Sequence, residues 1–291
     1  MTMKQTLTAC AVAVACVTAA QADCLSDAQV AELAQHYAAK TPAPNFAPLT
    51  DADGECTRAR LNQLLAQRLG KVVGYKAGLT NPAVQKRFNT DKPVWGKLYE
   101  GMVRPSGATV DAAFGSRPLY EADMLVRVKR SAIHHARTPH DVLQSIDQII
   151  PFIELPDLLV QAPPQLNGAA GVAAINVGAR LGVAGEPLGI PATRGEQYAL
   201  LDALERMSVQ LTNDRGELLA PAGKGSDILG HPLQAVIWLA EALQKEGITL
   251  QPGDLISLGS FSPLLPPRAG LSVTATYLGL PGAQPVQVHF K

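Results

Sequence analysis

The sequence predicts an α+β fold, in which an N-terminal helical layer precedes a mixed, strongly bent β-core. Residues 23–70 carry apolar side chains at helical spacing, whereas from Val72 onward short β-type runs are broken by Gly and Pro. These strands and helices do not alternate in the regular order of a doubly wound or barrel α/β protein. With 291 residues, 47% of them hydrophobic and 17% charged, the chain is long enough to bury one extensive core.

The first 22 residues have the pattern of a secretory signal peptide. Lys4 supplies a charged start, Leu7 to Ala20 is apolar, and residues 20–22 are small enough for signal peptidase. The apolar run is shorter than the roughly twenty residues that span a bilayer as a helix, which makes a retained membrane anchor the weaker interpretation. We expect cleavage after Ala22 and a periplasmic or secreted protein that has no membrane contact after cleavage.

Two helices are predicted in residues 23–70. Ser26 and Asp27 can cap the first, and the apolar positions at helical spacing are Val30, Leu33, Ala34 and Tyr37, then Leu61, Leu64, Leu65 and Leu69. Cys24 and Cys56 are the two cysteines that remain after cleavage, and in an oxidising compartment they favour one disulfide between the two helical segments. Two unpaired thiols are the alternative.

Residues 71–291 are predicted to form the catalytic domain. The predicted strands are 72–79, 119–128, 149–155, 170–176, 207–212, 254–258 and 271–278. Two helices interrupt them, one from Pro139 with Thr138 as its cap and one from Pro232 to Lys245 that Gly247 ends.

The charge balance favours a small-molecule partner. Lys plus Arg and Asp plus Glu are 25 each, so no net field gathers nucleic acid or anionic membrane. We expect no nucleic-acid partner.

Acidic residues in two predicted strands form the first candidate site. Glu121 and Asp123 are two apart in a strand and would project from one face, while Glu154 lies in a second apolar strand where a lone buried carboxylate is costly. Three converging carboxylates would suit Mg²⁺, Mn²⁺ or Ca²⁺. About two acid-x-acid pairs are expected by chance in such a chain, so solvated side chains or simple ion pairs are the alternative.

Two further segments carry candidate functional groups. In the predicted strand from Val72, Gly74, Lys76 and Gly78 share one face, and the glycines would leave an open slot from which the lysine reaches a bound anion. An edge-strand lysine in water is the alternative. Ser260, in a Gly-Ser turn after a buried strand, could present its hydroxyl to a carboxylate, although ordinary turn chemistry explains it equally well.

Taken in order, six segments resemble the 2-keto-4-pentenoate hydratase and 2-oxo-hept-3-ene-1,7-dioate hydratase branch of the fumarylacetoacetate hydrolase superfamily. The resemblance runs from Val72 to the C-terminus. The segments are Val73-Gly-Tyr-Lys-Ala-Gly-Leu-Thr, Asp91-Lys-Pro-Val-Trp-Gly, Glu121-Ala-Asp, Pro151-Phe-Ile-Glu-Leu-Pro-Asp, Leu229-Gly-His-Pro-Leu-Gln-Ala-Val-Ile-Trp-Leu-Ala and Gly259-Ser-Phe-Ser-Pro.

The resemblance implies a fold, a cofactor and an activity. The fold would be the superfamily's C-terminal type of bent β-core, and the cofactor Mg²⁺ or Mn²⁺ held by Glu121, Asp123 and Glu154. A hydratase of this branch isomerises a 2-hydroxy-dienoate and adds water, which gives a 4-hydroxy-2-oxo acid. The resemblance also implies a 2-oxo acid substrate, a role in aromatic catabolism and a homo-oligomer.

The same resemblance assigns roles to five further positions. Lys76 and Asp91 match the positions for proton movement and active-site ordering, and Leu79, Ser260 and Phe261 match positions beside the substrate.

The sequence also departs from the branch. Asp123 stands where these hydratases usually carry Glu, and residues 174–180 keep Asn176 but lack the neighbouring acid and serines of the hydratase pocket. Three alternatives therefore stay open: a 2-oxo acid decarboxylase, an acylpyruvate-type hydrolase, and an exported binder of small 2-oxo acids without turnover.

Overall fold

The computed structural model describes residues 23–162, 166 and 168–291. The predicted signal peptide and its cleavage position lie outside these residues. Within the described part, no helix combines the length and apolar character needed to cross a membrane.

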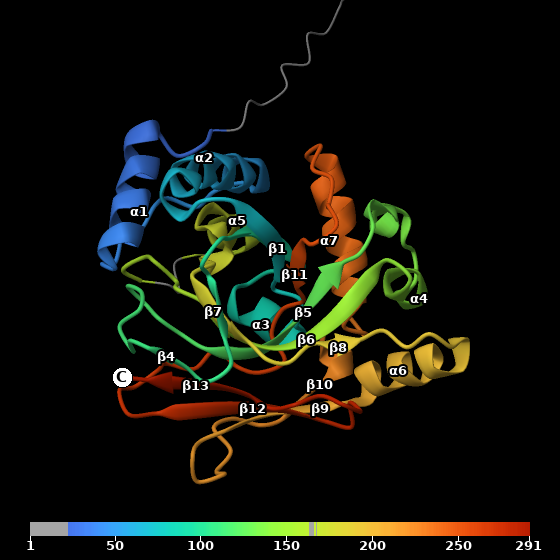
Figure 1. Cartoon of the computed structure of the whole chain (residues 1–291). Helices are drawn as coiled ribbons and strands as arrows, with labels where there is room; N and C mark the ends of the chain where they lie inside the picture. The colour runs from blue at the N-terminus through green and yellow to red at the C-terminus, as the bar shows by residue number, and fades with distance from the viewer. Residues whose placement is uncertain (1–22, 163–165, 167) are drawn as a thin grey trace, which may run out of the picture.

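Helices and strands are mixed along the whole described chain (Figure 1). The helices are α1 Asp27–Ala39, α2 Asp51–Leu69, α3 Pro82–Arg87, α4 Pro139–Leu143, α5 Gly168–Ala174, α6 Arg194–Arg206 and α7 Gln234–Lys245, with 3₁₀ turns η1 Ser131–His135, η3 Asn176–Gly178 and η4 Gly225–Asp227. The strands are β1 Val72–Gly78, β2 Val94–Tyr99, β3 Val103–Pro105, β4 Ala108–Val110, β5 Glu121–Val128, β6 Ile146–Leu155, β7 Leu181–Ala184, β8 Leu188–Gly189, β9 Ser208–Thr212, β10 Gly223–Lys224, β11 Leu255–Ser257, β12 Ser272–Leu278 and β13 Val286–Phe290.

Two sheets form the β-core. The larger has the strand order β2-β1-β11-β5-β6-β7-β3, with β8 added to β6, and it mixes parallel and antiparallel pairs. The smaller, of order β10-β9-β12-β13-β4, lies along the lower side of the molecule in Figure 1. Tyr277 of β12 joins the sheets, because its hydroxyl donates to the carbonyl oxygens of Asp123 in β5 and Phe152 in β6. The mixed α+β core predicted from the sequence is confirmed.

The helical layer formed by α1 and α2 begins at two capping boxes. The side chains of Ser26 and Thr50 accept hydrogen bonds from the backbone at the third helical position of each helix. Val30, Leu33, Ala34 and Tyr37 are buried, as their spacing predicts. These side chains join a hydrophobic cluster that includes residues of β2 and α5, so the layer shares a core with the β-bearing part of the chain.

A disulfide joins Cys24 to Cys56 with a Cα–Cα distance of 5.6 Å. It ties the start of α1 to α2, and the predicted pairing is confirmed. Arg58 of α2 also links the layer to β2 and to the end of α7. Its buried guanidinium lies 3.8 Å above the Trp95 ring and pairs with Glu246, just beyond α7.

One predicted strand is wrong. Residues 170–176 form most of α5 and the start of η3, because the alanine-rich segment has high helix propensity and is buried on all sides, which removes any amphipathic pattern. The helices that begin after Ser26 and Thr138 are confirmed, as is a helix ending at Lys245. The prediction omitted α3 and α6 and several short strands, including β2 and β13.

Candidate active site

The two antiparallel strands β5 and β6 place the three predicted acids on one face. Glu121 lies directly opposite Glu154 in the strand register, and Asp123 is two residues further along the same face. All three side chains are buried. The apolar residues between them point to the opposite face and fill the core, so the alternation of the sequence itself brings the carboxylates together.

Lys76 of β1 reaches this face from two strands away. Its ammonium group pairs with Glu154 and donates a hydrogen bond of 2.9 Å to the carbonyl oxygen of Val177. The side chain is only 3% exposed, which rules out the edge-strand lysine in water. Val177 fills part of the predicted open slot, because its side chain would lie 2.4 Å from a Cβ at Gly78, but a small cavity still reaches Lys76 and Gly78.

Asp123 is held by hydrogen bonds from its neighbour Met124, from the end of β11 and from the turn that follows β11. Its Oδ1 accepts from the backbone N–H groups of Met124, Leu258 and Gly259, and its Oδ2 accepts from the Ser257 hydroxyl at 2.5 Å. Gly259 makes this approach with a φ of +100°, and a Cβ there would lie 2.0 Å from the Thr80 hydroxyl. Asp123 therefore orders the turn that carries Ser260.

The acids are electrostatically coupled. Burial, and after it the charge of Glu154, raise the pKa of Glu121 well above its ordinary value, while Lys76 lowers it. Burial and Glu154 likewise raise the pKa of Asp123, and the Ser257 hydroxyl opposes that shift. The second carboxylate oxygen of Glu154, Oε2, is buried with no hydrogen-bond partner in the described structure. The site thus has more acceptor oxygens than cations or N–H groups to satisfy them.

The described residues contain no group of three or more His, Cys, Asp or Glu side chains arranged to hold a metal ion. Two of the required oxygens are engaged elsewhere, because Glu154 pairs with Lys76 and Asp123 bonds to Ser257 and backbone N–H groups. The three acids share a face without forming a ligand shell.

A small cavity of about 40 Å³ opens onto Lys76 and Glu121. Leu79 and Ser260, predicted to lie beside the substrate, both line it. A hollow of about 310 Å³ adjoins it and shares the wall residues Asn81, Val84 and Leu264. Of the three acids, Glu121 is the one that lines the cavity.

Two predicted site residues lie elsewhere. Phe261 is directed into the core, where it packs edge-on against Tyr277 with ring centroids 6.4 Å apart, and it lines only the adjoining hollow. Asp91 is exposed in the turn before β2 and does not line the catalytic cavity. The structure therefore groups Lys76, Glu121, Leu79 and Ser260 at the cavity and leaves Asp91 outside it.

Sequence reasoning missed the contribution of the 176–178 turn. Val177 has a left-handed φ of 55°, unusual for a β-branched residue, and this conformation accompanies the bond from its carbonyl oxygen to Lys76. Asn176 fixes the turn, since its Oδ1 accepts from the Lys97 N–H and its Nδ2 donates to the Lys97 carbonyl. In the sequence, the only residue that indicated a role for this turn was Asn176, which the family resemblance retains.

Known proteins resemble the chain in sequence and in fold. A 2-hydroxyhexa-2,4-dienoate hydratase of Comamonas testosteroni is 28% identical over 80% of this chain and 88% of its own length. A 2-keto-4-pentenoate hydratase of Burkholderia vietnamiensis is 29% identical over 81% and 88%. No family model matches the chain.

Solved structures extend the comparison. A 4-oxalocrotonate decarboxylase of Pseudomonas putida G7, complexed with calcium and acetate, has a TM-score of 0.74 at 26% identity and covers 92% of this chain and 99% of its own. A fumarylpyruvate hydrolase of Pseudomonas aeruginosa, in complex with Mn²⁺ and pyruvate, shares the fold with a TM-score of 0.53 at 12% identity over 74% and 88%.

The bent mixed core has the fold of the fumarylacetoacetate hydrolase superfamily, as the sequence predicted. In sequence the chain is similar to 2-keto-4-pentenoate hydratases and to a 2-hydroxyhexa-2,4-dienoate hydratase, as its segments predicted.

Proposed function

We propose that the protein is a metal-dependent hydro-lyase that adds water to a 2-hydroxy-dienoate, through its 2-oxo-enoate form, to give a 4-hydroxy-2-oxo acid. The observation that carries the proposal is the buried Lys76–Glu154 pair beside Glu121 at the base of a cavity. Relatives named as hydratases of such compounds cover most of the chain.

The oxygen donors of the acid face suit a divalent cation, which would compete with Lys76 and Ser257 for Glu154 and Asp123. Glu154 Oε2 is a buried oxygen without a partner, and burial and mutual repulsion raise the pKa values of Glu121 and Asp123, so a cation nearby would stabilise all three carboxylates. An all-oxygen donor set suits Mg²⁺ or Mn²⁺, and related structures contain calcium, magnesium or manganese. Glu121, Asp123 and Glu154 would hold the ion, which would supply Lewis-acid stabilisation of the substrate's enolate.

The chain's own residues position the substrate and move its protons. The Lys76 ammonium is fixed by Glu154 and by the Val177 carbonyl, so one of its protons can be directed into the cavity towards a carbon or oxygen of the substrate. The Ser260 hydroxyl donates to the Ser262 carbonyl oxygen, and its proximity to Glu121 lowers the pKa of that carboxyl. Leu79 and Val84 line the apolar side and exclude bulk water from the reacting carbons.

Location, assembly and pathway belong to the same proposal. The Cys24–Cys56 disulfide favours an oxidising compartment, which supports export to the periplasm or the medium. The homo-oligomer and the role in aromatic catabolism rest on the family resemblance.

The test is turnover of 2-hydroxypenta-2,4-dienoate in the presence of Mg²⁺. We expect Lys76→Met and Glu154→Gln each to lower kcat/KM by about 10²–10⁴-fold, because each removes a proton-transfer or ordering group. Lys71→Met and Glu186→Gln, both at exposed positions, are matched controls that should retain full activity. Equal activity in all five proteins would refute the proposal.

A decarboxylase is the second candidate, because the solved structure with a TM-score of 0.74 is a 4-oxalocrotonate decarboxylase. Release of CO₂ from 4-oxalocrotonate, measured beside hydration of the dienoate, separates the two activities. Metal-dependent binding of pyruvate or oxalate without any product would instead indicate a binding protein.

A further inference from the structure

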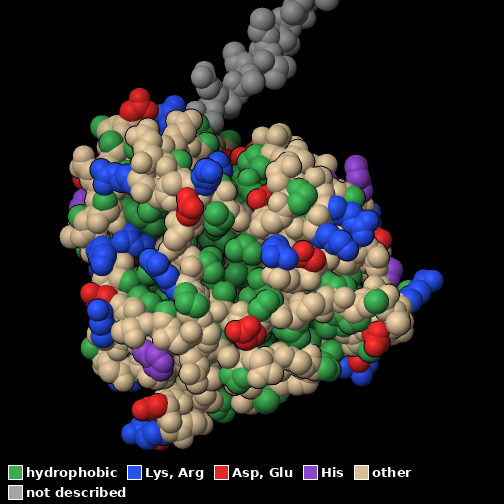
Figure 2. Space-filling model, in the orientation of Figure 1, with side chains coloured by type: hydrophobic (Ala, Val, Ile, Leu, Met, Phe, Trp, Pro, Cys, Tyr) green, Lys and Arg blue, Asp and Glu red, His purple; other side chains and the backbone are tan. Residues whose placement is uncertain are grey.

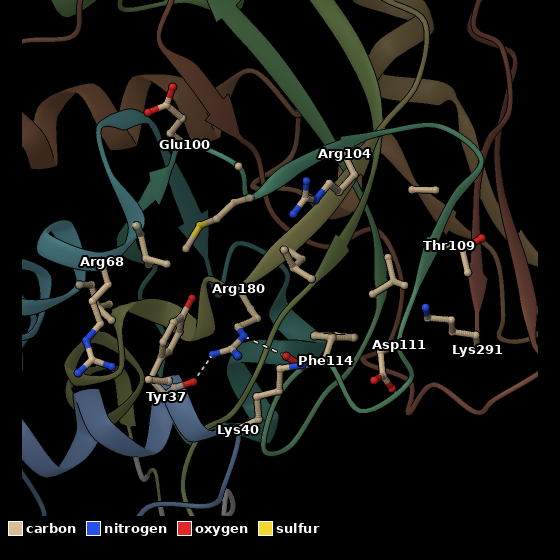
Figure 3. A pocket seen from close by; sticks show the side chains of 18 residues that line it. Tyr37, Lys40, Arg68, Glu100, Arg104, Thr109, Asp111, Phe114, Arg180 and Lys291 are labelled. Atoms are coloured by element: carbon tan, nitrogen blue, oxygen red, sulfur yellow. Dashed lines mark hydrogen bonds between the residues drawn. The ribbon is translucent and has the colours of Figure 1, made fainter.

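A second and larger hollow lies between the helical layer and the C-terminal part of the chain. It has a volume of about 810 Å³ and shares no lining residue with the catalytic cavity. Five cationic side chains line it, and we call it the basic cleft: Lys40, Arg68, Arg104, Arg180 and Lys291 (Figure 3). They come from α1, α2, β3, the turn before β7 and the C-terminus, so the fold brings together charges that are distant in sequence.

These five cations have few counter-charges. Among the described residues, Glu100 and Asp111 are the only acidic side chains that line the cleft. Among the described residues, none of the five cations takes part in an ion pair. In the space-filling view, Lys and Arg side chains gather on the left, below the helical layer (Figure 2). The cleft therefore keeps an excess of positive charge.

Arg180 is fixed in place at the centre of the cleft. Its Nε donates to the Phe114 carbonyl at 3.1 Å, one terminal nitrogen donates to the Tyr37 carbonyl at 2.6 Å, and the guanidinium lies 4.1 Å from the centre of the Tyr37 ring (Figure 3). Because a guanidinium has five N–H donors and the Tyr37 side chain is a third partner, at most two remain without an acceptor in the described part of the chain. A fixed fork of free donors is well suited to carboxylate or phosphate oxygens.

The base of the cleft is apolar. Tyr37, Leu65, Met102 and Phe114 are buried there, and a low-dielectric floor beneath cations strengthens their attraction for an anion. The volume is within the range of roughly 300–1,000 Å³ that small-molecule sites occupy. A single inorganic ion would leave most of it empty, whereas a molecule with two or three anionic groups could contact several cations at once.

We propose that the basic cleft binds a small, multiply charged anion, of the di- or tricarboxylate or organic phosphate class, at a site separate from the catalytic cavity. Arg180 is the fixed anchor, and Arg68, Arg104 and Lys40 are exposed partners on the walls. The proposal does not depend on hydratase activity.

The experiment is isothermal titration calorimetry of the full protein with propane-1,2,3-tricarboxylate and, separately, with glycerol 2-phosphate, at low salt and without divalent metal. We expect saturable binding of at least one of them at one site, weakened when salt is raised. The double variant Arg68→Gln/Arg104→Gln should bind at least about tenfold more weakly. Both side chains are exposed, so the variant should fold normally.

Two controls make the result specific. Arg130→Gln removes an equally exposed arginine outside the cleft and should bind as the unmutated protein does. Lys76→Met removes the cation of the catalytic cavity and should also leave binding unchanged.

Four outcomes would overturn the proposal. They are no saturable binding of either anion, equal weakening by Arg130→Gln, and loss of binding in Lys76→Met with retention in the double variant. The fourth is that a second copy of the chain covers the cleft. In that case the unmutated protein would not bind the anions, and sedimentation would show a different oligomeric state for the double variant.

Discussion

The catalytic cavity and the basic cleft both present cations to a hollow, but they do so in opposite ways. In the cavity, Lys76 is buried and is paired with Glu154 and a carbonyl oxygen. In the cleft, Arg68 and Arg104 are exposed and unpaired in the described structure. A buried charge is costly unless it is paired, whereas an exposed charge is screened by solvent. We therefore expect strongly coupled effects of substitution in the cavity and nearly independent, small effects in the cleft.

The largest expected effect on stability is at the buried pair. Lys76→Met leaves Glu154 buried without its cation, and we expect the free energy of unfolding of the metal-free protein to fall by about 3–5 kcal/mol. The double variant Lys76→Met/Glu154→Gln should lose less than the single variant, because it removes both charges. Urea denaturation of the unmutated, single and double variants measures this coupling, and additive losses would contradict the strong pairing.

The disulfide should give the next largest effect, and it reaches the cleft through the helical layer. Cys24 and Cys56 are separated by 32 positions, so removal of the bond should destabilise the protein by about 4 kcal/mol in the chain-entropy model. The helical layer that it fixes forms one wall of the basic cleft. In the Cys24→Ser/Cys56→Ser variant, we expect a lower Tm and weaker anion binding in the cleft. A Tm equal to that of the unmutated protein would refute the stabilising role of the bond.

The cavity should also respond to pH, with a sign set by Glu121. Its pKa in the folded protein is raised above the ordinary value of 4.5, first by burial and then by Glu154. The folded protein therefore binds the Glu121 proton more tightly than the unfolded chain does. The stability gained in this way is fully present below pH 4.5 and is lost as pH rises through the pKa of Glu121 in the folded protein. As pH rises from 5 to 8 in the absence of metal, the free energy of unfolding of Glu121→Gln should fall less than that of the unmutated protein.

Thermal melts of both proteins across this pH range measure the difference. Mg²⁺ should raise the Tm of the unmutated protein near neutral pH and have little effect on Glu121→Gln, because the carboxylate that the ion would stabilise is gone. Parallel pH curves for the two proteins would contradict the raised pKa of Glu121.

The sequence predicted best those features that depend on local spacing. The helix starts after Ser26 and Thr138 follow from their side-chain caps, and the shared face of Glu121 and Asp123 follows from the two-residue period of a strand. Where a segment is buried on all sides, as in 170–176, no periodic pattern distinguishes helix from strand. The wrong prediction there has this cause.

Contacts between distant segments were beyond the reach of sequence patterns. Asp123 is held by Ser257 and Gly259, more than 130 positions away, and Lys76 by Val177, 101 positions away. Family resemblance supplied the candidate residues, but it could not show that Phe261 points into the core or that Asp91 is exposed. The basic cleft was not foreseen, since its cations lie on five separate segments.

The smallest expected effect is the most direct test of the contrast between the two hollows. Arg104→Gln removes an exposed, unpaired cation, and we expect the free energy of unfolding to change by less than about 0.5 kcal/mol. Neighbouring cations repel one another, so any change should be slightly stabilising and should vanish at high salt. Urea denaturation at two salt concentrations, with Arg130→Gln as the control, measures it. A loss of several kcal/mol would mean that Arg104 is paired in solution, and the cleft would then resemble the cavity in using its cations to hold the fold together.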